Sequence, residues 1–177
     1  MRKLLSSAFI ISGIIVLLFS FFLILHRNNP NRLSFDINNM NSSQNQSELV
    51  PIGIKISSIN VNLPIVYSSI ADGKWEATEN GVSYLSQSVI PGEIGNSILY
   101  GHNWRSILGN LPKVKPGDLI EIYYENGTKK TFEVSFTQIV EPTQTSILDN
   151  TEDTRITLYT CTGFLDTKRF VVTAVLI

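Results

Sequence analysis

The feature that most constrains this chain is an uncharged run near its N-terminus. Residues 4–25 contain only aliphatic and aromatic side chains, serines and Gly13. A helix over this run would be about 33 Å long at about 1.5 Å per residue, enough to cross the apolar core of a bilayer. We therefore expect a single membrane-spanning anchor over residues 1–25.

A cleaved secretory signal is the alternative for this run. The apolar part of such a signal usually has about 7–15 residues and is followed by small residues at the cleavage site. Here the run is longer and ends in Ile-Leu-His-Arg-Asn-Asn-Pro, so a retained anchor fits better. The basic residues on its two sides, Arg2 and Lys3 against Arg27 and Arg32, give little indication of orientation.

The next segment, residues 26–50, is polar and rich in asparagine. It offers few apolar side chains to bury, so burial cannot offset the entropy lost on ordering it. We interpret it as a flexible tether, the alternative being an irregular cap on the following domain. The net charge of −1 and the lack of a basic stripe argue against a nucleic-acid partner.

From residue 51 to residue 177 the pattern is one of short β-type runs separated by turns. Asn126-Gly127 predicts a tight hairpin turn, because both residues tolerate positive φ. No stretch keeps a helical apolar period over three turns, although 104–111 and 145–148 suit short helical turns. This pattern predicts an all-β sandwich or barrel. The expected strands are 52–57, 59–66, 97–102, 119–124, 131–140, 155–160 and 169–177.

The only cysteine, Cys161, ends one of these runs, and an exported chain needs a reason to keep one unpaired thiol. Alternation along 157–161 puts Thr157, Tyr159 and Cys161 on one strand face and Leu158 and Thr160 on the other. Sulfur is a strong nucleophile when a histidine and a cation activate it.

The candidates for those two partners are His102 and Arg169. His102 also ends a strand run and follows Gly101, which lets the backbone approach closely. If the strands on either side of residues 162–168 pair, Arg169 returns beside Cys161. Its planar fork can there meet a substrate carbonyl or a developing oxyanion. Taken singly, a buried cysteine, a structural histidine and a solvated arginine are the commoner explanations, but the combination indicates catalysis.

Thr157-Leu158-Tyr159-Thr160-Cys161 resembles the Thr-Leu-x-Thr-Cys signature of sortases, the membrane-anchored cysteine transpeptidases of bacterial surfaces. Residues 98–102 and 169–172 resemble the segments that supply the histidine and the arginine of that family. The resemblance covers about 52–177. It implies a closed eight-stranded β-barrel with short helical turns, preceded by an N-terminal transmembrane helix.

The resemblance also implies an activity, a location and partners. The enzyme would cleave an LPxTG-like sorting peptide of a secreted surface protein, forming a thioester on Cys161. It would pass the acyl group to an amine of peptidoglycan or of a pilin, outside a bacterial membrane that the chain crosses once. His102 would act as general acid and base, Arg169 would stabilise substrate and oxyanion, and Thr160 would support the oxyanion or the substrate.

Some features refine this expectation. The segment between Cys161 and Arg169 is short, as in class D and E sortases, and residues 26–50 lack the Asp-Pro-aromatic pattern of the lid in pilin-polymerising members. No cofactor is expected. Calcium is a possible ligand, but it is not indicated, since the acids near the site are scattered. These acids are Glu141, Asp149, Glu152 and Asp153.

Residues 89–92 and 143–148 are candidates for lining a substrate groove, and Trp75 and Trp104 are expected to be packing anchors. Two other functions stay open at this point. One is an extracellular cysteine peptidase that only hydrolyses, and the other is a non-catalytic peptide-binding barrel whose thiol is incidental.

Overall fold

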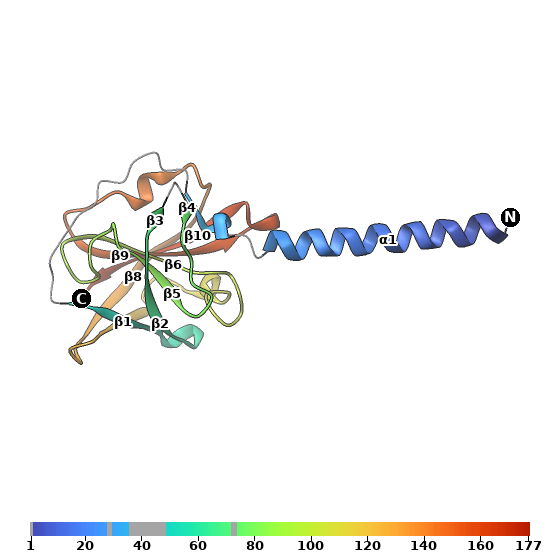
Figure 1. Ribbon diagram of the computed structural model, residues 1–177. Coiled ribbons are helices and arrows are strands. Elements are labelled where there is room, and N and C mark those ends of the chain that lie inside the picture. Colours follow the sequence, from blue (N-terminus) through green and yellow to red (C-terminus); the bar gives the residue numbers. More distant parts are fainter. Residues whose placement is uncertain (1, 28–29, 36–48, 72–73) are drawn as a thin grey trace.

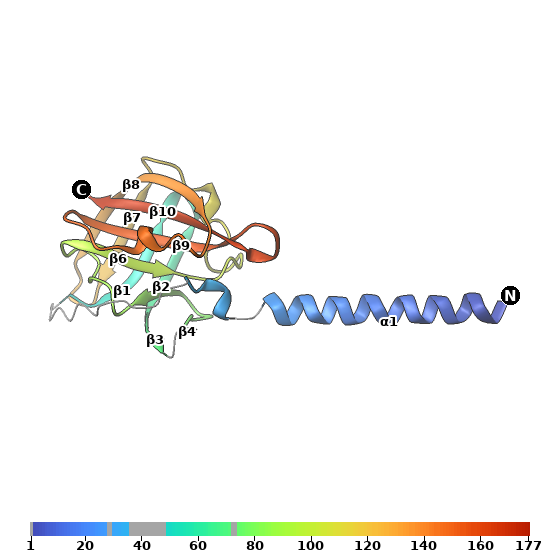
Figure 2. The ribbon, with the colours of Figure 1, turned by 90° about the horizontal axis from the view of Figure 1, so that it is seen from above.

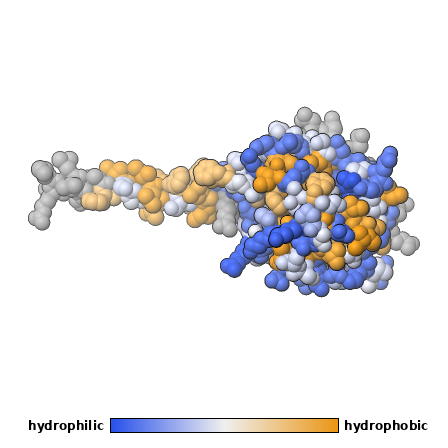
Figure 3. Space-filling view, turned by 180° about the vertical axis from the view of Figure 1, so that it is seen from behind, coloured by the Kyte–Doolittle hydropathy of each residue, from blue (hydrophilic) through white to orange (hydrophobic). Residues whose placement is uncertain are grey.

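The computed structural model describes residues 2–27, 30–35, 49–71 and 74–177 of the chain. Helix α1 (Arg2–Arg27) extends away from a β-domain that begins at β1 (Figure 1). Phe9–His26 has a mean hydropathy of 2.7, so by length and composition this helix could cross a membrane. Figure 3 shows mostly hydrophobic surface on the coloured part of this helix. The predicted tether lies partly outside the described residues, at 28–29 and 36–48.

Eight strands close into one barrel in the order β1-β2-β5-β6-β9-β10-β8-β7 (Figures 1 and 2). This confirms the predicted all-β barrel. The barrel strands are β1 (Pro51–Ile56), β2 (Val61–Ser68), β5 (Val82–Leu85), β6 (Gly95–Tyr100), β7 (Leu119–Tyr124), β8 (Lys129–Val140), β9 (Thr154–Thr162) and β10 (Lys168–Leu176). A separate hairpin is made of β3 (Ile70–Ala71) and β4 (Lys74–Trp75). The short 3-10 helices are η1 (Pro30–Leu33), η2 (Ser57–Ile59), η3 (Leu111–Lys113), η4 (Thr145–Leu148) and η5 (Phe164–Asp166).

Alternation along the strands separates two apolar layers. The inward residues form the barrel core, with Leu158 of β9 beside Phe170 and Val172 of β10. The outward residues of the same strands, such as Tyr159 and Val171, belong to a second cluster on the outside. The period-two face assignment made for residues 157–161 is therefore confirmed.

The second cluster, here called the outer cluster, covers the outward face of β6, β9 and β10. Its members are Leu33, Phe35, Trp75, Leu85, Ile98, Tyr100, Val140, Leu148, Tyr159, Cys161 and Val171. The rings of Tyr100 and Tyr159 stack at 5.5 Å, and Trp75 packs edge-on against Tyr100 at 5.2 Å. An outward sheet face with this much buried aromatic surface needs a cover, and Trp75 of β4 supplies part of it.

Strand β5 was not predicted from the sequence. It is four residues long and pairs in parallel with β2. Val82 lies opposite Ile65 at one end of the pairing, and Leu85 lies opposite Ser68 at the other. The predicted hairpin at Asn126-Gly127 is confirmed, with Gly127 at φ 80° between β7 and β8.

Candidate active site

The three predicted site residues lie at one end of three adjacent strands. Strands β6 and β9 are parallel, with Tyr100 opposite Tyr159. Two residues beyond this pair, β6 leads to His102 and β9 reaches Cys161. Strands β9 and β10 are antiparallel, with Arg169 directly opposite Cys161. Sequence positions about 60 residues apart are thus brought into one row by strand register, at spacings of about 5 Å per strand.

The turn from β6 to His102 is held against β9 by two hydrogen bonds. The amide of Gly101 donates to the carbonyl of Tyr159 at 3.2 Å, and the hydroxyl of Thr160 donates to the carbonyl of Gly101 at 2.7 Å. A Cβ on Gly101 would lie 3.0 Å from the Ile107 side chain, which agrees with the close approach predicted there. Thr160 is fully buried, and in this structure its hydroxyl fixes the position of the His102 segment.

Cys161 is a free cysteine with only 5% of its surface exposed. Its thiol donates a hydrogen bond to the backbone carbonyl of Arg32, with 3.0 Å between sulfur and oxygen. Burial raises the pKa of this thiol to about 11, a shift that the positive charge of Arg169 opposes and the negative charge of Asp166 reinforces. At neutral pH the sulfur is therefore held as a thiol.

His102 is buried beneath Trp104, whose ring stacks on the imidazole at 4.3 Å and within 9° of parallel. Burial lowers the pKa of His102, while the carboxylates of Glu79 and Asp166 act in the opposite direction. Burial thus disfavours the charged form of the imidazole, as it disfavours the thiolate of Cys161. Trp104, which was predicted to be mainly a packing anchor, packs on the imidazole of His102.

Arg169 is almost fully buried, at 3% exposure. Its Nη1 donates to the carbonyls of Asp166 and Lys168, each at 3.1 Å, and its Nη2 donates to the carbonyl of Ser34 at 2.8 Å. Its Nε is buried and has no hydrogen-bond partner among the described residues. A buried donor without a partner is costly, so this atom is available for an incoming oxygen.

Asp166, in the turn between β9 and β10, connects the surroundings of these groups. Its carboxylate forms an ion pair with Arg32 at 2.8 Å and accepts a hydrogen bond from the side-chain amide of Asn103 at 2.7 Å. Sequence reasoning did not single out Asp166. Its partners come from distant parts of the chain, so no local pattern indicates the contacts.

Residues 32–35 lie against Cys161 and Arg169 and are here called the strap. Leu33 and Phe35 are buried members of the outer cluster, at 0% and 3% exposure. All four residues of the strap are partly or fully buried, while the flexible tether over residues 26–50 stays a prediction. The chain therefore covers the Cys161 thiol with this segment, although residues 26–50 lack the Asp-Pro-aromatic pattern.

The two predicted groove segments have different outcomes. Residues 143–148 border the outer cluster, to which Leu148 belongs and against which Ile147 packs. Residues 89–92 precede β6, whereas His102 follows it, and the carbonyl of Gly92 accepts a hydrogen bond from Lys130 of β8. This second segment lies at the far end of the barrel, so its prediction as a groove wall was wrong.

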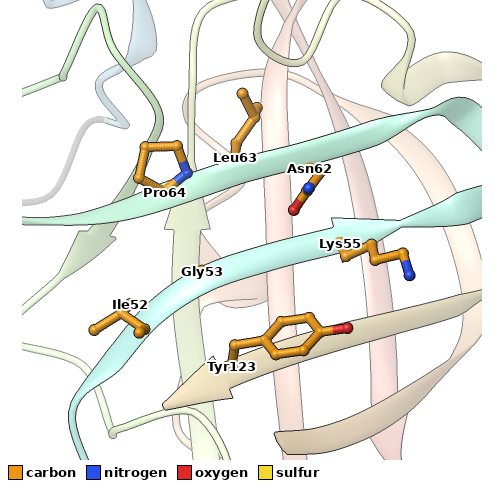
Figure 4. A pocket seen from close by; sticks show the side chains of 7 residues that line it. All are labelled: Ile52, Gly53, Lys55, Asn62, Leu63, Pro64 and Tyr123. Carbon is orange, nitrogen blue, oxygen red and sulfur yellow. The ribbon is translucent and has the colours of Figure 1, made fainter. Parts of the chain in front are cut away.

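A hollow on the outside of β1, β2 and β7 lies away from the site (Figure 4). It is lined by Ile52, Gly53, Lys55, Asn62, Leu63, Pro64 and Tyr123. Strand β1 stands across the closed barrel from β9, so this hollow does not adjoin Cys161.

Among the described residues, no group of three or more His, Cys, Asp and Glu side chains could hold a metal ion. Two of the acids considered for calcium have basic partners instead. Asp153 pairs with Arg155, and Glu141 lies 3.2 Å from Lys168.

A family model for the sortase domain matches residues 54–177, about seven tenths of the chain. The chain belongs to the sortase family. Members of this family are cysteine transpeptidases, and the row of His102, Cys161 and Arg169 falls inside the matched region.

Two curated relatives are similar over most of this sortase domain. Sortase A of Listeria monocytogenes is 35% identical over 124 residues, which is 67% of this chain and 52% of the relative. Sortase D of Bacillus subtilis is 31% identical over 112 residues, 63% of this chain and 54% of the relative. The chain spans about half the length of these relatives. The second match is consistent with the predicted class D or E type.

Solved sortases have the same fold. The crystal structure of Listeria monocytogenes sortase A is 30% identical and aligns with a TM-score of 0.57, covering 74% of this chain and 88% of that one. A Clostridium perfringens sortase D5 transpeptidase is 28% identical with a TM-score of 0.61, covering 72% and 79%.

Proposed function

We propose that this sortase domain is a cysteine transpeptidase that cleaves a sorting peptide and transfers its acyl part to an amine. The observation that carries the proposal is the row of a buried free thiol, an imidazole and a guanidinium on adjacent strands β6, β9 and β10. The family match and the similarity to curated sortases support the same reaction.

Cys161 is the proposed nucleophile. Its sulfur attacks the carbonyl carbon of the scissile amide while the thiol proton passes to the neutral His102. The C–N bond then breaks, His102 returns the proton to the leaving amine, and the acyl group remains on sulfur as a thioester. An incoming amine attacks the thioester, and its proton passes through His102 to restore the thiol.

Arg169 is proposed to stabilise the oxygen that becomes negative during both steps. The guanidinium is fixed by the carbonyls of Asp166 and Lys168, so it needs no reorganisation when the charge develops. The unpartnered Nε is a free donor for that oxygen. Thr160 supports the site indirectly. Its hydroxyl binds the carbonyl of Gly101 and so positions the turn that carries His102.

The proposed substrate is an LPxTG-like sorting peptide of a secreted surface protein, and the proposed acceptor is an amine of peptidoglycan or of a pilin. The proposed location is the bacterial membrane, crossed once by α1, with the barrel outside. The length and hydropathy of α1 and the family match support this location.

The test is a product assay on the full chain in detergent, with a fluorogenic Leu-Pro-Glu-Thr-Gly peptide and triglycine as acceptor. We expect a new peptide joined to triglycine, and no product from Cys161→Ala. Cleavage of equal rate with and without the amine, and no joined product, would indicate the peptidase that only hydrolyses. Absence of covalent labelling of Cys161 by a vinyl sulfone peptide would indicate the non-catalytic barrel.

A further inference from the structure

The turn between β9 and β10 carries the most exposed large apolar side chain among the described residues. Phe164 is 84% exposed, and its neighbour Leu165 is 39% exposed. These two residues are here called the apolar tip. A single exposed apolar side chain is ordinary on a protein surface. The place of this pair is not, because the turn extends from the barrel toward α1 in both ribbon views (Figures 1 and 2).

Arg32 connects the apolar tip with the end of α1. Its guanidinium donates one hydrogen bond to the carbonyl of His26 in the last turn of α1, at 3.1 Å, and another to the carbonyl of Leu165. The same guanidinium pairs with Asp166 at 2.8 Å. Leu165 and Asp166 have φ angles of 51° and 57°, a conformation that residues other than glycine rarely adopt. These contacts therefore hold the turn in an unusual conformation beside α1.

Side chains of α1 and of the turn also border one hollow. It is lined by Leu23, His26, Arg32, Asn103, Leu165 and Asp166. The apolar window of α1 ends at His26, so a membrane crossed by α1 would have its apolar boundary near this residue. The apolar tip thus lies at the level where lipid gives way to water.

The length of the chain limits how far the site can lie from that boundary. The carbonyl of Arg32 contacts the Cys161 thiol at 3.0 Å, and α1 ends at Arg27. The five residues between these points span at most about 16–18 Å. Strand β9 has nine residues and is therefore about 30 Å long. Ile94, just before β6, lies at the opposite end of β9 and hence far from the boundary.

We propose that the apolar tip docks into the interface of the membrane that α1 crosses. The partner is the lipid bilayer itself, because phenylalanine and leucine at this level bury their apolar surface among the upper parts of the acyl chains. The tip is a second membrane contact in addition to α1, and it holds the barrel with the end that carries Cys161 toward the lipid. The inference rests on the proposed location of α1 and not on the proposed reaction.

The main test places a fluorophore at the tip, as Phe164→Trp in the full chain reconstituted into phosphatidylcholine–phosphatidylglycerol vesicles. The emission that this tryptophan adds to that of the unmodified chain should fall at least about twofold when the acyl chains carry bromine, because bromine quenches on contact. The matched control is Ile94→Trp, at a position that is 72% exposed at the opposite end of the barrel. Its added emission should be the same in brominated and ordinary lipid.

A second measurement uses the unmodified chain, in case a variant does not fold, which circular dichroism will show. In lipid nanodiscs, a nitroxide-bearing lipid should broaden the NMR amide signals of residues 163–165 and leave those of residues 92–94 sharp. Unquenched emission from Phe164→Trp, equal quenching of the two variants, or equal broadening of the two segments would overturn the docking. A chain that does not float with vesicles in a density gradient would refute the proposed location together with the docking. Peptide turnover, measured separately, tests the reaction alone.

Discussion

Substitution of Asp166 by asparagine tests how the strap is fastened. The ion pair between Asp166 and Arg32 is largely sheltered, with side-chain exposures of 17% and 11%, so water and salt screen it weakly. Asparagine keeps the shape and the length of the side chain but removes the charge that faces Arg32.

The expected size follows from that contact. A hydrogen bond to a charged group contributes about 1.5–3 kcal/mol. Loss of this amount from the closed state should raise the population of molecules with an open strap by about 10- to 150-fold. Alkylation of Cys161 at pH 8 should accelerate by a similar factor, because the reagent reacts only with the uncovered thiol.

The pH dependence has a definite sign. Burial and the charge of Asp166 both raise the pKa of Cys161, so removal of the carboxylate lowers this pKa from its value of about 11. The midpoint of the alkylation profile should therefore move to lower pH. The charge of Asp166 also opposes the lowering of the His102 pKa by burial, so the same variant should lower that pKa further.

Iodoacetamide labelling between pH 6 and pH 11, followed by intact mass measurement, checks both the faster alkylation of Cys161 and the shifted midpoint of its pH profile. The matched control is Asp153→Asn, which removes the same charge from an ion pair with Arg155 at the opposite end of β9. That control should label at the unmodified rate. An Asp166→Asn profile that superimposes on the unmodified one at every pH would refute the reasoning.

Three further outcomes are expected. Arg169→Lys should lower kcat/KM for the sorting peptide at least 100-fold with the fold intact, because a compact ammonium cannot hold two carbonyls and still donate to an oxyanion; near-normal turnover would make Arg169 structural. Trp104→Ala should raise the pKa of His102, measured by NMR titration, because the imidazole loses the stacked ring that buries it. Thr160→Val should lower the free energy of unfolding by about 1–3 kcal/mol in urea titrations, since it leaves the buried carbonyl of Gly101 without its donor; no loss would mean that this bond is dispensable.

The barrel was predictable because its strands carry local signals. Alternation placed Tyr159 and Cys161 on one face, and Asn126-Gly127 marked the hairpin between β7 and β8. The short strand β5 was missed because its four residues, Val82–Leu85, are all buried and show no alternation. Its parallel pairing with β2 is a tertiary property that a short apolar run does not indicate.

The row of site residues was predictable in part. The pairing of Arg169 with Cys161 follows from one short antiparallel connection, whereas the position of His102 depends on the parallel pairing of β6 with β9. The strap was missed because its composition is dominated by polar neighbours. Only two apolar side chains, Leu33 and Phe35, distinguish it. Their burial depends on an aromatic surface that exists only after the barrel has closed.

Opposing free-energy terms determine how firmly the strap covers the thiol. Burial of Leu33 and Phe35 contributes about 1.5–3 kcal/mol each, and the three carbonyl hydrogen bonds add about 0.5–1.5 kcal/mol each. Ordering the backbone of residues 32–35 costs about 1–2 kcal/mol per residue, and immobilising the two apolar side chains costs about 0.5–1 kcal/mol each. The gain and the cost are both about 5–10 kcal/mol. The sheltered ion pair between Asp166 and Arg32 then adds to the stability of the covered state.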